Sequence, residues 1–164
     1  MQCKENKRSG ALHLTQKVDY AIILLASLAV KKELRSVKNI AEEKRLSFSF
    51  LQKVARELQL SGFIKAERGK NGGYRLCQTP EEISLKEIIE ALEGPIAVVP
   101  CLKSSECSYE AYCTIRPGFK KLNEQIKTHF DQTSLANFLQ EGKSQQTLQQ
   151  KTLLIHINAP LGTL

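Results

Sequence analysis

Apolar and polar positions follow one another along this chain with the spacing of short helices, then of two strands, then of helices again. The longest apolar run, AIILLASLAV at residues 21–30, is interrupted only by Ser27. It is about half the length needed to cross a bilayer, so it predicts a buried helix rather than a membrane span. Thr15 is the expected N-cap of this helix, which we expect to be buried over most of its circumference.

Two shorter helices are predicted next, with a tight turn at residues 45–46 between them. Ser36 is the expected N-cap of the first helix and Ser47 that of the second, which Gly62 ends. The apolar positions at helical spacing are Val37, Ile40 and Ala41 in the first helix and Leu51, Val54 and Leu58 in the second. This pattern predicts a helix-turn-helix.

Two strand-like segments follow the helix-turn-helix. Residues 63–68 (FIKAER) and 74–77 (YRLC) are joined by GKNGG, and Asn-Gly followed by Gly is a strong signal for a tight turn between strands. A helix-turn-helix followed by a basic hairpin is the layout of a winged helix. The predicted fold is therefore mainly α with a small β-hairpin.

The C-terminal half contains two further helical patterns. Ser84 and Glu87 form a capping-box signature, and the apolar positions behind it end at Gly94. A long helix is predicted from about residue 117, with one apolar stripe formed by Phe119, Leu122, Ile126 and Phe130. The stripe fits a C-terminal dimerisation helix, or a helix that packs onto the first helix of its own chain, because an apolar stripe does not name its partner.

Positive charge is concentrated in the middle of the chain. The formal net charge is +7, and residues 35–75 contain ten Lys or Arg against four Asp or Glu, a surplus of +6. An anionic partner is expected to bind at this stretch. The charge alone, however, is equally consistent with a basic surface that is only solvated. In a helix-turn-helix the second helix enters the major groove, which gives the charge a double-stranded DNA target.

The predicted winged helix identifies the candidate DNA contacts. Serine and glutamine can read base edges, lysine and arginine contact phosphates, and the wing would lie over the adjacent minor groove. The candidates are Ser47, Ser49, Gln52, Lys53 and Arg56 in the second helix and Arg68, Lys70 and Arg75 in the hairpin. Taken singly, Ser47 could serve only as a cap and Gln52 could simply face solvent.

Three of the five cysteines are evenly spaced: Cys101, Cys107 and Cys113 have five residues between neighbours in CLKSSECSYEAYC. The chain start has no secretory signal pattern, so we expect a cytoplasmic, reducing environment. Structural zinc sites usually pair their ligands at shorter spacing, whereas an iron-sulfur cluster suits a loop that wraps around it. Cluster, zinc and redox-active thiols all remain open on spacing alone. Cys77 is expected to be a half-buried small hydrophobe.

Catalysis has no support in the sequence. A nucleophile such as Cys113 with a base such as His129 would need a third orienting group and a pocket, and no motif supplies them. We therefore expect no enzymatic activity and no small-molecule substrate. A cluster protein that docks other proteins instead of DNA is the remaining alternative, and steep salt dependence of DNA retention would separate the two.

The segments LTQKVDYAIILLASLA and IAEEKRLSFSFLQKVARELQLSGFIKAERGKNGGYRL, together with the spaced cysteines, resemble the iron-sulfur winged-helix regulators of the IscR and NsrR type, the Rrf family of bacterial repressors. The resemblance runs from about Leu14 to Leu139. It implies a homodimer that binds a palindromic or semi-palindromic operator, with an iron-sulfur cluster in each protomer altering DNA affinity or sequence preference.

The resemblance also bears on the fourth cluster ligand. IscR-like members have a histidine three residues after the third cysteine, where this chain has Arg116, which cannot ligate. NsrR-like members have an aspartate four residues after the threonine of the LT pair, where this chain has Asp19. Asp19 from the other protomer is thus the preferred ligand. Its structural alternative is a carboxylate that only interacts with the positive end of the helix dipole in the first turns of its own helix. Glu106, Glu110 and an external ligand are the other options.

These inferences define the expected protein and its parts. A 4Fe–4S cluster is preferred and a 2Fe–2S cluster is the alternative, with nitric oxide, oxygen or redox state, or cluster supply as the signal. A thiol-switch or zinc-dependent regulator is the alternative function. We expect a flexible extension (1–13), a winged helix-turn-helix (14–94), a cysteine loop (95–116), a dimerisation helix with a short terminal helix (117–139), and a tail that the sequence leaves unassigned (140–164).

Overall fold

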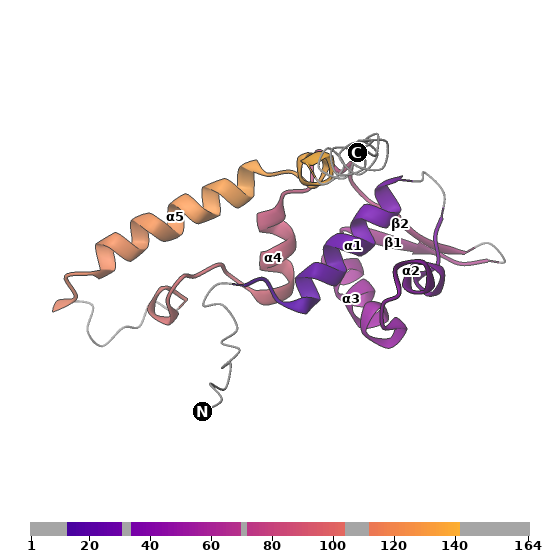
Figure 1. Cartoon of the computed structure of the whole chain (residues 1–164), viewed down its shortest axis with the longest axis horizontal. Coiled ribbons are helices and arrows are strands. Elements are labelled where there is room, and N and C mark those ends of the chain that lie inside the picture. Colours follow the sequence, from indigo (N-terminus) through magenta and orange to yellow (C-terminus); the bar gives the residue numbers. More distant parts are fainter. Residues whose placement is uncertain (1–12, 31–33, 70–71, 104–111, 142–164) are drawn as a thin grey trace, which may run out of the picture.

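The computed structural model describes residues 13–30, 34–69, 72–103 and 112–141 of the 164-residue chain. The elements in order are α1 (Gln16–Val30), α2 (Val37–Lys44), α3 (Phe48–Leu60), β1 (Ile64–Glu67), β2 (Gly73–Leu76), α4 (Leu85–Glu93), the short 3-10 helix η1 (Pro100–Leu102) and α5 (Arg116–Gln132). A last helical segment covers 135–141. The helices α1 to α3 and the hairpin gather on one side of α4, and α5 extends away on the other (Figure 1).

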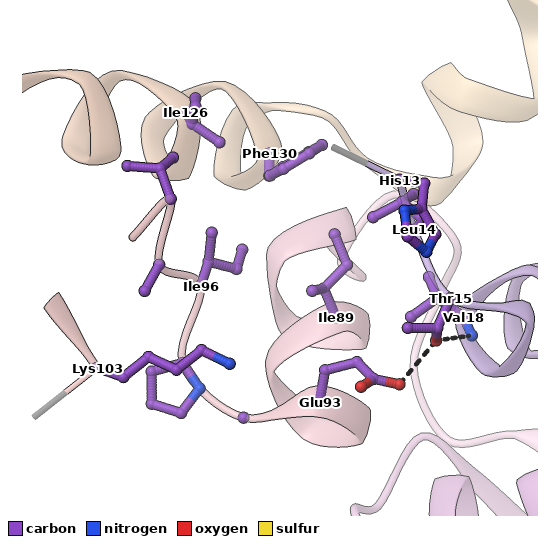
Figure 2. A pocket seen from close by; sticks show the side chains of 14 residues that line it. His13, Leu14, Thr15, Val18, Ile89, Glu93, Ile96, Lys103, Ile126 and Phe130 are labelled. Atoms are coloured by element: carbon purple, nitrogen blue, oxygen red, sulfur yellow. Dashed lines mark hydrogen bonds between the residues drawn. The ribbon is translucent and has the colours of Figure 1, made fainter. Parts of the chain in front are cut away.

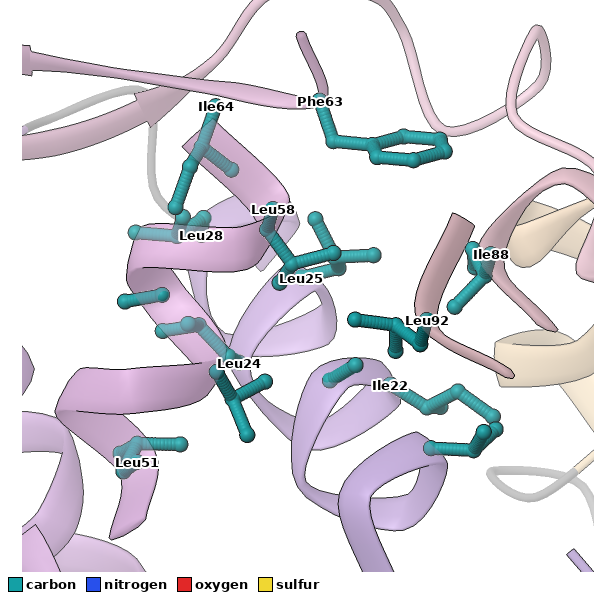
Figure 3. Close-up of a cluster of buried hydrophobic side chains, with 14 of the residues drawn as sticks. Ile22, Leu24, Leu25, Leu28, Leu51, Leu58, Phe63, Ile64, Ile88 and Leu92 are labelled. Carbon is teal, nitrogen blue, oxygen red and sulfur yellow. The ribbon is translucent and has the colours of Figure 1, made fainter. Parts of the chain in front are cut away.

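The core lies between α1, α2, α3 and α4, with β1 closing one end (Figure 3). The buried positions of α1 are Val18, Ala21, Ile22, Leu24, Leu25, Ser27 and Leu28. At 100° per residue they occupy more than half of the helix circumference, which confirms the predicted burial. The stripe of α3 is buried as predicted at Leu51, Val54 and Leu58, so the opposite side of α3 is left to solvent.

The turn between α2 and α3 follows the sequence prediction closely. Ser36 caps α2 by accepting a hydrogen bond from the Asn39 N–H at 3.1 Å. Arg45 takes a left-handed conformation with φ 55°, and the Leu46 N–H bonds back to the Ala41 carbonyl at 2.8 Å. This closure satisfies carbonyls at the end of α2 and turns the chain into α3.

Ser47 occupies the N-cap position of α3, but the predicted side-chain cap is not formed. Its hydroxyl lies 3.2 Å from that of Ser49, and its backbone N–H donates to the Tyr20 hydroxyl at 3.4 Å. Tyr20 also packs its ring edge-on against Phe50, with centroids 4.8 Å apart. The start of α3 is therefore held by a side chain from α1 rather than by Ser47 itself.

The strands β1 and β2 form the predicted antiparallel hairpin, with Ile64 opposite Leu76 and Glu67 opposite Gly73. Arg35 extends this sheet, because its backbone exchanges hydrogen bonds of 3.1 and 2.9 Å with Tyr74. The backbone of Arg35 lies so close to Gly73 that a Cβ there would stand 2.7 Å from it. A glycine is therefore required at position 73 by close backbone approach.

The capping box of α4 is present as predicted: Ser84 accepts from the Glu87 N–H at 3.2 Å, and Glu87 accepts from the Ser84 N–H at 2.9 Å. The helix α5 packs chiefly against α4, where Lys86 and Asp131 form an ion pair of 3.1 Å. Its principal neighbour is thus α4 rather than α1, the intramolecular partner considered above. No helix among the described residues is both long and apolar enough to span a membrane.

Candidate DNA-binding surface and cysteine site

The predicted DNA-contacting residues of α3 share one outward face. Ser49, Gln52, Lys53 and Arg56 are exposed on the side opposite the buried stripe, and Ser47 is exposed at the N-cap position just before the helix. The spacing of Ser49, Gln52, Lys53 and Arg56 places them above one another along successive turns. The core thus fixes which side of α3 is turned outward, and this side presents polar and cationic groups.

The hairpin adds two exposed arginines, Arg68 and Arg75, while Lys70 lies outside the described residues. Arg75 donates from Nε to the Glu67 carboxylate across the hairpin at 2.5 Å. This pair partly neutralises Arg75, which sits opposite Lys65 in the register. Arg68 lies next to the hairpin tip and has no such pair among the described ion pairs, so its charge is the more available of the two to a phosphate.

Arg35 ties the hairpin to the helix-turn-helix, and sequence reasoning gave it no role. Its guanidinium donates to the Ser27 carbonyl near the end of α1 at 3.1 Å and also pairs with Glu43 on α2. Hydrogen bonds from Lys44 and Arg35 lower the pKa of the Glu43 carboxyl from 4.5 to about 2. The strands, α1 and α2 therefore meet at one residue, whose contacts only the folded chain brings together.

Cys101 and Cys113 lie on either side of the segment that contains Cys107. Cys101 is in η1 and Cys113 stands shortly before α5; both thiols are free and half-buried. Cys107 lies outside the described residues. Thiolates are soft ligands that suit iron-sulfur clusters or zinc, so the two described donors are chemically compatible with either.

Asp19 is exposed in the first turn of α1, and Arg116 is buried at the first residue of α5. Among the described residues, no group of three or more His, Cys, Asp or Glu is arranged to hold a metal ion. The predicted set is not brought together within one described chain, since Cys107 falls outside it and Asp19 is expected from another protomer. Cys77 is exposed, which corrects the expectation of a half-buried side chain: β2 ends one residue earlier.

A pocket of about 410 Å³ lies where α1 begins and α4 ends, under α5 (Figure 2). Ile89, Ile96, Ile126 and Phe130 supply apolar walls, and Glu93 faces Thr15 across the opening. Asn123 of α5 holds the segment after α4: its side-chain amide donates to the Ile96 carbonyl at 3.2 Å and accepts from the Val98 N–H at 3.0 Å. The route from α4 to Cys101 is thus fixed against α5.

The first turn of α1 carries a second set of contacts that the sequence did not reveal. The Lys17 ammonium donates to the Leu92 carbonyl at the end of α4 at 2.5 Å and to the Glu57 carboxylate on α3 at 3.2 Å. The Thr15 hydroxyl donates to Glu93 at 2.7 Å. These partners stand 40 to 78 positions away along the chain, so no local pattern could have indicated them.

A helix-turn-helix with a polar, cationic outward face, followed by a basic hairpin, defines a winged-helix DNA-binding protein. The particular family is shown by its sequence profile, described as an iron-dependent transcriptional regulator, which matches residues 14–141. The chain belongs to this Rrf2 family of transcriptional regulators. This confirms the resemblance seen in the sequence.

Individual relatives agree with the family. The transcriptional regulator NsrR of Shouchella clausii is 36% identical over 109 residues, which cover 64% of this chain and 73% of that protein. The structure of CymR, the global cysteine regulator of B. subtilis, has a TM-score of 0.64 at 29% identity and covers 77% of this chain and 95% of its own.

The structure of T. potens IscR has the same TM-score, 0.64, at 27% identity, and the match covers 82% of this chain and 91% of that one. The family and these relatives are transcriptional regulators rather than enzymes, as expected from the sequence.

Proposed function

We propose that this chain is a homodimeric, cytoplasmic repressor whose binding to a DNA operator is controlled by an iron-sulfur cluster. In this proposal residues 14–94 bind DNA, residues 95–116 hold the cluster and residues 117–139 dimerise. The observation that carries the proposal is the position of Cys101 and Cys113: two half-buried free thiols in the connection between the DNA-binding helices and α5. A group bound by these thiols would act on both the DNA-binding helices and α5.

The proposed cluster ligands are Cys101, Cys107 and Cys113 of one protomer and Asp19 of the other. Asp19 is exposed at the start of α1, where a second chain can reach it. Arg116 is buried and cannot serve in place of a histidine. A 4Fe–4S cluster with an oxygen ligand would offer an iron open to nitric oxide or oxygen; a 2Fe–2S cluster is the alternative.

Dimerisation is proposed through the apolar stripe of α5. Within the chain only Arg116 and Asn123 of this helix are buried, while Leu122 is 46% exposed and Phe119 is half-buried. Ile126 and Phe130 line the pocket within the chain, so Phe119 and Leu122 in the N-terminal half of α5 are the part of the stripe that a second copy would cover. A second copy would also bring two α3 helices to successive major grooves, about 34 Å apart.

DNA binding is proposed to use the outward face of α3 for base edges and phosphates and Arg68, Lys70 and Arg75 for the minor groove. Support comes from the exposure of every described member of this set. Because cations displace counterions from DNA, the affinity should fall steeply with salt. A partner that is only a protein would not show that dependence on a DNA duplex.

A thiol switch or a zinc site is the second candidate. It is favoured by the similarity to the CymR structure, whose protein is named as a cysteine regulator. Both candidates share the DNA-binding module and differ in what the cysteines hold. Iron-sulfide absorption in the visible range distinguishes them, since zinc and free thiols have none.

The test uses the full chain, purified without oxygen, and a duplex selected from a random-sequence pool by the cluster-loaded protein. We expect Cys107→Ala and Cys113→Ser to lose the cluster and the difference in duplex affinity between loaded and cluster-free protein. Cys77→Ser is the matched control, because Cys77 is exposed on the hairpin side of the fold, and it should behave as the parent chain does. A Cys107→Ala protein that keeps full cluster-dependent binding contradicts the proposal.

A further inference from the structure

Lys17 connects three helices at the end of the molecule from which the cysteine segment departs. Its ammonium lies 2.5 Å from the Leu92 carbonyl, 3.2 Å from the Glu57 carboxylate and 3.7 Å from the Glu93 carboxylate. These partners belong to the last turn of α4 and to α3. A single cation in α1 therefore holds the end of α4 to α3, the recognition helix that is predicted to enter the major groove.

The contact with α4 has a clear electrostatic basis. The last carbonyls of a helix lack intrahelical partners, and the C-terminal end carries partial negative charge that a cation stabilises. At the end of α4 the Gly94 N–H donates a hydrogen bond to the Glu90 carbonyl, and the Lys17 ammonium donates one to the Leu92 carbonyl. Thr15 holds Glu93 from the same turn of α1 at 2.7 Å (Figure 2). The end of α4 is thus fixed to the start of α1 by polar contacts.

The contact with α3 lies next to the proposed DNA-binding face. Glu57 follows Arg56 directly, and it is half-buried while Arg56 is exposed. A shift of Lys17 would therefore act on the turn of α3 that carries Arg56. Tyr20, one turn further along α1, holds the N-terminus of α3 through the Ser47 N–H. The first turns of α1 consequently contact α3 at both ends.

The same turns of α1 carry Asp19, and the chain passes from α4 through Gly94 and Pro95 to Cys101. The Lys17 contacts therefore lie near proposed ligands of two clusters: Asp19, two residues along α1, would reach the partner's cluster, and the cysteine segment directly after α4 would hold this chain's own. We infer that Lys17 is a positioning residue that transmits the state of the cysteine site to the recognition helix. This inference rests on the proposed cluster-controlled DNA binding.

A purely structural role for Lys17 predicts that its removal leaves the ratio of duplex affinities between cluster-loaded and cluster-free protein unchanged. The side chains of Lys17 and Glu57 are 28% and 43% exposed, and ion pairs of such exposure add little to stability. Removing the ammonium should thus leave the fold intact. If Lys17 transmits the state of the site, its removal should instead change the ratio of duplex affinities between cluster-loaded and cluster-free protein.

The experiment measures that ratio for the parent chain and for Lys17→Met, using the selected duplex described above and full-length protein. Lys17→Met keeps the aliphatic length and removes the charge. We expect the ratio to fall about fivefold, within the roughly two- to thirtyfold range that mutations along coupled networks produce. Lys17→Arg should restore most of the ratio, because a guanidinium can reach both a carbonyl and a carboxylate.

Lys127→Met is the matched control. Lys127 is also 28% exposed and pairs with Glu124 at 3.6 Å, but this pair stays within α5. Its ratio should equal that of the parent chain. Glu57→Gln, alone and combined with Lys17→Met, provides a second route: the two changes should be non-additive in the ratio, since they break the same contact. Glu57→Gln also serves if Lys17→Met fails to fold.

The possible outcomes separate the two proposals. If the parent chain binds the duplex equally with and without cluster, the proposed function fails, and this inference fails with it. If the parent chain responds to the cluster and Lys17→Met responds to the same extent, only the role of Lys17 is refuted. An equal loss in Lys127→Met would also refute it, because the effect would then follow from any lost surface charge pair.

Discussion

Gly73→Ala tests whether close backbone packing attaches the hairpin to the helix-turn-helix. A Cβ at this position would stand 2.7 Å from the carbonyl carbon and oxygen of Arg35 and 2.9 Å from its nitrogen, too close for any carbon. The strand must therefore move away from Arg35. The two backbone hydrogen bonds between Arg35 and Tyr74, of 3.1 and 2.9 Å, would be lost or lengthened.

The expected cost follows from these contacts. Two backbone hydrogen bonds contribute about 2 kcal/mol together, and displacing packed groups adds roughly 1–3 kcal/mol. We expect Gly73→Ala to lower the free energy of unfolding by about 3–5 kcal/mol, measured by urea denaturation at a fixed protein concentration. The duplex affinity should fall as well, because the wing would be displaced from α3.

Gly118→Ala is the control for this measurement. Gly118 lies in the first turn of α5, and a Cβ there meets no atom within 4 Å. Alanine is favoured over glycine in helices, so the change should be neutral or stabilising by up to about 1 kcal/mol. A Gly73→Ala protein within about 0.5 kcal/mol of the parent chain, the usual range of neutral surface changes, would refute the close packing described for Arg35.

Two further predictions concern stability and pH. Ser84→Ala removes half of the capping box and should lower the free energy of unfolding by about 1 kcal/mol in the same assay; an unchanged value would contradict the cap. The pKa of Glu43 is lowered to about 2 by Lys44 and Arg35. Its stabilising contribution is therefore complete above pH 4.5 and is lost as the pH falls toward 2. A carboxyl titration by NMR checks this: a midpoint near 4.5 would contradict the pairing.

Local signals in the sequence were sufficient for most of the fold. The capping box at Ser84, the apolar spacing in α3 and the turn residues of the hairpin each depend on neighbours within a few positions, so their positions could be predicted to within a residue or two. Ser47 was misjudged as a side-chain cap because the group that holds its N–H is Tyr20, far away in the sequence.

The candidate sites likewise contain features that local sequence patterns predict and contacts between distant residues that they do not. The outward face of α3 follows from its buried stripe, and the cysteine spacing is visible in the sequence itself. The contacts of Lys17 and Arg35 could not be predicted, because a cation in a helix or a loop has no pattern that names a carbonyl or carboxylate in another element. Partial neutralisation of Arg75 by Glu67 likewise depends on strand register.

The central claim is that the three spaced cysteines hold an iron-sulfur cluster that controls DNA binding. The most direct measurement is one anaerobic preparation of the full chain, reconstituted with iron and sulfide, in which both elements are counted per protomer alongside the visible spectrum and the native mass. We predict a dimer with broad iron-sulfide absorption and equal amounts of iron and sulfide, consistent with one cluster in each protomer. A reconstituted protein that contains neither iron nor sulfide would contradict the account.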